Sequence, residues 1–84
     1  MAQTGKVLCV DDEPHVLDGL KRTLRRSFRV STAVGPDEGL AALETEGPFP
    51  VVLSDLRMPK INGLEFLSQV RALYPDTSLS LIHI

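Results

Sequence analysis

Three carboxylates in this 84-residue chain stand where apolar runs end, and their positions suit metal chemistry. Asp11 and Asp12 directly follow Lys6–Val10, and Asp55 directly follows Pro50–Ser54. A carboxylate removed from water needs a partner, and neighbouring carboxylates repel one another. If the two runs are adjacent strands, the three groups converge. They would then suit a hard divalent ion such as Mg²⁺, which takes oxygen ligands.

A local interpretation of the same carboxylates is also open. Asp11, Asp12 and Glu13 would then cap the start of a helix, and Asp55 would cap a loop. The carboxyl ends of neighbouring parallel strands lie at one edge of a sheet, where function collects. The matching positions at two strand ends therefore favour the metal site.

The elements that would position these groups alternate between strand and helix. Apolar or alternating runs predict strands at Lys6–Val10, Phe28–Ala33, Pro50–Ser54 and Leu79–Ile84. Prolines, acidic residues and turn signals predict the helices between them: Pro14 to Arg26, Pro36 to the Gly47-Pro48 pair, and the Asn62-Gly63 turn to the residue before Pro75. This order predicts an α/β fold with a parallel sheet and right-handed crossovers.

Each predicted helix has apolar residues at helical spacing that would pack on the sheet. They are Leu17, Leu20 and Leu24, then Leu40, Ala41 and Leu43, and finally Leu64, Leu67, Val70 and either Leu73 or Tyr74. Basic residues cover the outer face of the first helix: Lys21, Arg22, Arg25 and Arg26. We interpret them as solvated surface, with a phosphate-binding patch as the alternative.

Composition limits the classes of protein that the chain can represent. Hydrophobic residues make up 43% and charged residues 24%, which is typical of a soluble globular domain. The net charge of −2 gives no general attraction to nucleic acid or membranes. Because Cys9 is the single cysteine in the sequence, the chain has no internal disulfide, and Cys9 is expected to be a buried small hydrophobe. His15 and His83 have no metal-ligand spacing, and no apolar run approaches membrane-spanning length, so a cytoplasmic location is expected.

The motifs themselves resemble the receiver domain of two-component response regulators, over about residues 6–76. The string VDDEP ends at Pro14, and SDLRMPKINGLEFL runs from Ser54 to Leu67. The residues that match the family pattern, in order and at its separations, are Asp11, Asp12, Asp55, Met58, Pro59 and Gly63. The resemblance implies a flavodoxin-like doubly wound sheet with strand order 2-1-3-4 over the part present.

The resemblance also implies a role for each site residue. Asp55 would be the phosphoacceptor, attacking a phosphohistidine to form an acyl phosphate. Asp11 and Asp12 would hold Mg²⁺, with Asp55 and the backbone carbonyl of Arg57 as further ligands. The implied partners are a sensor histidine kinase or phosphotransfer protein and a downstream output domain, with no direct contact to nucleic acid or membrane.

The sequence departs from the family pattern in its last residues. The family's Ser or Thr at the end of the fourth strand and the Lys of the fifth are absent, and Ser78 and Ser80 stand at the start of the fourth strand. We expect a partial receiver over residues 1–77, and an incomplete fold of about four strands and three helices over the whole chain. Residues 78–84 are expected to be a non-native tail that forms or mimics the fourth strand. The alternative is a natural divergent strand, which Leu79, Leu81, Ile82 and Ile84 would suit. Phosphorylation of such a fragment is expected to be poor.

Two other classes of protein remain open. A phosphohydrolase with an aspartate nucleophile usually has a second Asp two residues later as general acid, and that position is Arg57. A receiver-like interaction module without phosphorylation often loses the acidic pair or the acceptor, whereas Asp11, Asp12 and Asp55 are all present. Both observations favour the phosphoacceptor receiver.

Overall fold

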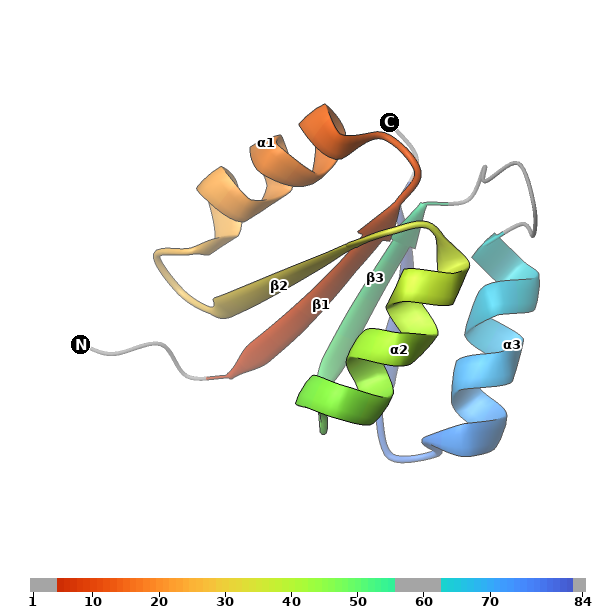
Figure 1. Cartoon of the computed structure of the whole chain (residues 1–84). Coiled ribbons are helices and arrows are strands. Elements are labelled where there is room, and N and C mark those ends of the chain that lie inside the picture. The colour runs from red at the N-terminus through yellow and green to blue at the C-terminus, as the bar shows by residue number, and fades with distance from the viewer. Residues whose placement is uncertain (1–4, 56–62, 83–84) are drawn as a thin grey trace.

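The computed structural model describes residues 5–55 and 63–82 and confirms the alternating order of strands and helices (Figure 1). The elements are β1 (Lys6–Asp11), α1 (Pro14–Leu24), β2 (Arg29–Val34), α2 (Pro36–Glu46), β3 (Val51–Asp55), α3 (Gly63–Leu73) and β4 (Ser78–Ile82). Helix α1 ends before the predicted Arg26, because residues 25–27 form a turn. None of the helices in the described ranges is long and apolar enough to cross a membrane.

The four strands form one parallel sheet in the order β2-β1-β3-β4, which confirms the predicted flavodoxin-like topology. Strand β1 lies between β2 and β3, so its carboxyl end has a neighbour on both sides. In the register of β1 and β3, Val10 stands beside Ser54. The residues that follow, Asp11 and Asp55, therefore lie next to each other at one edge of the sheet.

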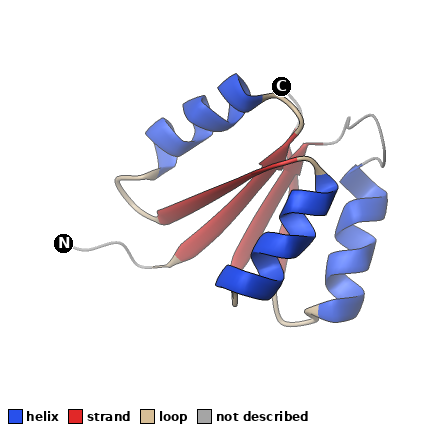
Figure 2. Cartoon of the chain, in the orientation of Figure 1, coloured by secondary structure: helices blue, strands red, loops and turns tan. Residues whose placement is uncertain are grey.

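Helices cover both faces of the sheet, α1 on one face and α2 with α3 on the other (Figure 2). Successive side chains of a strand point to opposite faces. In β1, Leu8 and Val10 therefore join the core under α2 and α3. Val7 and Cys9 join Leu17 of α1 in the core on the other face.

The buried face of α2 differs from the prediction by one position. Ala42 and Leu43 are buried as core residues, but Ala41 is exposed. The reason is the close approach of this helix at Gly39. A Cβ atom added there would lie 2.9 Å from Cζ of Phe66 and 3.0 Å from Cγ2 of Val10. The contact turns the Gly39 side of the helix inward and leaves Ala41 outside.

The buried face of α3 also differs in part from the prediction. Leu67 and Val70 are buried as expected, but Leu64 is 59% exposed and Leu73 is 64% exposed. Phe66, which the predicted face omitted, is fully buried between α3 and α2. The centre of the face lies at Phe66 because its ring fills the space that Gly39 leaves.

Candidate metal centre

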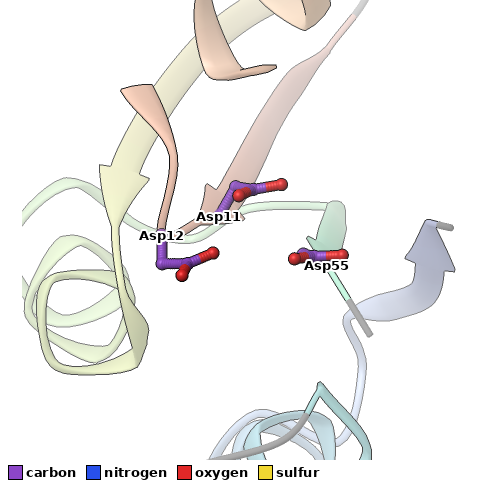
Figure 3. Close-up of side chains that lie close together, drawn as sticks. All are labelled: Asp11, Asp12 and Asp55. Atoms are coloured by element: carbon purple, nitrogen blue, oxygen red, sulfur yellow. The ribbon is translucent and has the colours of Figure 1, made fainter. Parts of the chain in front are cut away.

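The predicted convergence of the three carboxylates is confirmed. Asp11 ends β1, Asp55 ends the neighbouring β3, and Asp12 begins the link to α1. One carboxylate oxygen from each residue lies within 4.8 Å of the other two, and Figure 3 shows the side chains around a common space. Parallel pairing of β1 with β3 is what brings together residues that lie more than 40 positions apart in the chain.

The environment of the three carboxylates is uneven. Asp11 is buried at 3% exposure, whereas Asp12 and Asp55 are partly exposed. The backbone N–H of Glu13 donates a hydrogen bond of 2.9 Å to Oδ1 of Asp11. Asp11 therefore stabilises the turn that leads into α1. This agrees in part with the local interpretation, in which the acidic residues cap the start of the helix. Glu13 occupies the helix N-cap, but its side chain makes no capping hydrogen bond.

Burial raises the pKa of the Asp11 carboxyl above its usual value. The hydrogen bond from Glu13 opposes this shift, and the negative charges of Asp55 and Asp12 add to it. Three clustered carboxylates with one of them buried are therefore costly to keep ionised. A divalent cation would relieve the repulsion. The donors are all carboxylate oxygens, which fits a hard ion such as Mg²⁺.

Ser54 is a member of this region that the sequence reasoning did not single out. Its side chain is fully buried, and its hydroxyl donates a hydrogen bond of 3.2 Å to the backbone carbonyl of Asp55. The sequence does contain a signal, since Ser54 is the one polar residue in an apolar run. The bond satisfies the buried hydroxyl at the strand end that carries Asp55.

The other residues considered from the sequence have different outcomes. Arg57, Met58 and Pro59 lie outside the described residues, as does His83. His15 is exposed on α1. Cys9 is buried as predicted, and burial raises the pKa of its thiol to about 11, which fits a structural thiol.

Comparisons with known proteins all indicate the same protein family. The model of the response regulator receiver domain matches residues 7–83. The hydrogenase transcriptional regulatory protein HoxA of Cupriavidus necator is 47% identical over 70 residues, which cover 83% of this chain and 14% of HoxA. The transcriptional regulatory protein PrrA of Mycobacterium tuberculosis is 37% identical over 78 residues, which cover 92% of this chain and 33% of PrrA. The chain thus spans a third or less of the length of these relatives.

The fold of this chain is also similar to that of a response regulator of known structure. The crystal structure of the response regulator protein TrrA from Thermotoga maritima, in complex with Mg²⁺-BeF, superposes with a TM-score of 0.87. The two proteins are 31% identical, and the match covers 95% of this chain and 70% of TrrA.

Proposed function

The chain belongs to the response regulator receiver domain family of two-component signalling, and from this premise we propose that it accepts a phosphoryl group on Asp55. The observation that carries the proposal is the convergence of Asp11, Asp12 and Asp55 within 4.8 Å. The donor would be a phosphohistidine on a sensor kinase or phosphotransfer protein.

In the proposed step, a carboxylate oxygen of Asp55 forms a bond to phosphorus. The bond from phosphorus to the imidazole nitrogen breaks, and that nitrogen keeps the electron pair and takes up a proton. Asp55 suits this role because it is partly exposed, so a donor can reach it. Asp11 suits a supporting role because it is buried and held by the N–H of Glu13.

Asp11 and Asp12 would hold Mg²⁺ together with Asp55, and the carbonyl of Arg57 is proposed as a further ligand. When bound, the ion would offset the negative charge on the phosphoryl group, in a transfer that depends mainly on positioning and electrostatics. Two observations support this choice of ion: the oxygen-only donor set and the Mg²⁺-BeF complex of the similar protein TrrA. We propose a signalling role for the chain and no enzymatic turnover of its own.

The whole protein is proposed to act in gene regulation. HoxA and PrrA are both transcriptional regulatory proteins, and the chain spans 14% and 33% of their lengths. A receiver in such a protein would pass its phosphorylation state to an output domain.

The test is labelling of the 84-residue chain by radioactive acetyl phosphate with Mg²⁺. We expect weak labelling that hydroxylamine removes, as for an acyl phosphate, and that EDTA or Asp55→Asn abolishes. Asp18→Asn, which removes an exposed carboxylate on α1, should leave labelling unchanged. Labelling that survives Asp55→Asn would disprove the assigned acceptor. Absence of any label, with Mg²⁺ still stabilising the fold, would favour an interaction module.

A further inference from the structure

The positive charge of this chain is concentrated in one short segment. Five of the nine Lys and Arg residues lie within positions 21–29, and no Asp or Glu occurs between Asp18 and Asp37. We name these residues the basic patch: Lys21, Arg22, Arg25, Arg26 and Arg29. The rest of the chain holds four Lys or Arg and all eleven Asp and Glu. The net charge of −2, which gives no general attraction to nucleic acid, therefore averages stretches of the sequence with opposite sign.

The basic patch lies at the opposite end of the sheet from the clustered carboxylates. All five side chains are exposed. Their backbone positions run from the last turn of α1 through the turn that follows to the start of β2 (Figure 1). Arg29 stands beside Lys6 at the start of β1, whereas Asp11 ends that strand. Five residue steps along a strand span about 16 Å. The basic patch is therefore separate from the proposed metal centre.

A structural role explains only part of the basic patch. The carboxyl end of a helix carries partial negative charge and favours cations within its last turn. Lys21 and Arg22 lie in that turn. Arg26 and Arg29 lie beyond the end of α1, and Arg29 belongs to β2. The helix dipole therefore does not explain the positive charges of Arg26 and Arg29.

The chemistry of the surface favours a polyanion over a protein partner. Protein interfaces are organised around an apolar centre that is rich in aromatic residues and Met, even where Arg takes part. Among the described residues, the large hydrophobic side chains that are exposed are Val34, Leu64 and Leu73, and none is in the basic patch. Four of the five cations are Arg, whose planar group suits the bidentate binding of phosphate.

The same surface favours a duplex over a single strand. Proteins that bind single-stranded nucleic acid stack bases on exposed aromatic rings. The one aromatic residue in this segment is Phe28, which is partly buried and packs against the core beneath α1. Attraction to the backbone of a duplex needs only accessible cations.

We propose that the basic patch binds the phosphate backbone of a DNA duplex without reading its sequence. The choice of DNA rests on the proposed function, because a transcriptional regulator works next to a duplex. The contact would add a salt-sensitive attraction and orient the receiver, while sequence recognition would belong to other parts of the protein.

The test is titration of a short fluorescent DNA duplex with the 84-residue chain at low salt, followed by anisotropy. The variant Arg22→Gln/Arg26→Gln/Arg29→Gln should bind at least about tenfold more weakly, and the slope of log K against log salt should fall by about 3, one for each lost phosphate contact. Arg26→Gln and Arg71→Gln form a matched pair, since each removes one exposed cation and Arg71 lies on α3. Only Arg26→Gln should weaken binding.

Four results would overturn the proposal: no binding by the folded chain at low salt, binding that the triple variant leaves unchanged, tighter binding of an RNA duplex, or equally tight binding of poly-glutamate through the same arginines. The last result would indicate an acidic protein partner, and tighter binding of an RNA duplex would reassign the nucleic acid. Circular dichroism verifies that each variant is folded. Asp55 should still be labelled in the triple variant, so a failure of phosphotransfer and a failure of DNA binding are distinguishable.

Discussion

At the scale of single residues, Asp11 couples the proposed metal centre to the stability of the fold. Its pKa in the folded chain is raised above the ordinary value of 3.8, mainly by burial. The folded state therefore holds this proton more tightly than the unfolded state does. The stabilising contribution is complete below the unfolded pKa and is lost as the pH rises through the folded pKa. At neutral pH without metal, the ionised group lowers the free energy of unfolding.

Asp11→Asn should therefore stabilise the metal-free chain at neutral pH, because the amide is uncharged and its oxygen can still accept the bond from Glu13. We expect a gain of roughly 1 kcal/mol, a typical size for one substitution, or about 4–8 °C in Tm. Thermal melts in EDTA and in Mg²⁺ measure it, and Mg²⁺ should raise the Tm of the wild type but not that of Asp11→Asn. Asp18→Asn is the exposed control. A lower Tm for Asp11→Asn in EDTA would contradict the interpretation.

Cys9 offers a second measurement at this scale. Its thiol is buried, and its pKa is raised from 9.0 to about 11. The thiolate is the reactive form. Two pKa units alone reduce it about 100-fold near neutral pH, so a thiol reagent should label the native chain at least about 100-fold more slowly than the urea-unfolded chain. Equal rates would mean that the centre of the sheet is open to solvent.

The carboxylate cluster could be predicted from the sequence, but the hydrogen bonds beside it could not. Apolar runs that end at Asp11 and Asp55 predict buried strands, and parallel pairing then places their ends together. The hydrogen bond from Glu13 to Asp11 and the bond from Ser54 to Asp55 depend on local backbone angles. A run of residue types does not determine those angles.

At the scale of elements, the contact between α2 and α3 depends on one glycine. The Cβ of an alanine at Gly39 would meet Phe66 at 2.9 Å and Val10 at 3.0 Å, whereas one at Gly19 of α1 would meet nothing within 4 Å. Gly39→Ala should cost about 1–3 kcal/mol through overpacking, partly offset by helix propensity. Gly19→Ala should gain about 0.5–1 kcal/mol from propensity alone. Chemical denaturation of both variants measures the difference, and equal effects would show that Phe66 moves aside freely.

The order of elements could be predicted, whereas the packed helix faces could be predicted only in part. The alternation of runs and turn signals gave all seven elements with boundaries within a few residues. Helical spacing of apolar residues predicts Ala41 and Leu64 on the buried faces of their helices, but both are exposed. Gly39 and Phe66 form a complementary pair across two helices, and such a pair leaves no periodic signal in either helix.

At the scale of the whole molecule, the two faces of the sheet are covered unequally. Helix α1 packs on β1 and β2, and in the part of the chain that the structure describes no helix on that side packs on β3 or β4. Val51 and Leu53 of β3 lie on this face and are only partly buried. Strand β4 is also an edge of the sheet, where unpaired backbone groups favour association.

The 84-residue chain should therefore melt broadly or self-associate at high concentration. Sedimentation and calorimetry over a range of concentrations measure this, and Leu53→Thr should reduce the association because it makes the partly buried face more polar. Leu73→Thr, on the exposed side of α3, is the matched control. A sharp two-state transition of a monomer above about 50 °C, as in ordinary mesophilic domains, would contradict this expectation.

The basic patch and the clustered carboxylates place groups of opposite charge at opposite ends of β1 and β2. An approaching anion exerts a torque on the molecule that turns the Arg26 end toward the anion and the Asp55 end away from it. A phosphoryl donor is itself an anion, so encounters at the Arg26 end, which cannot react, should compete with encounters at Asp55. Added salt shortens the range of this torque, to a Debye length of about 10 Å at 0.1 M. Moderate ionic strength should therefore raise the rate at which small anionic donors reach Asp55.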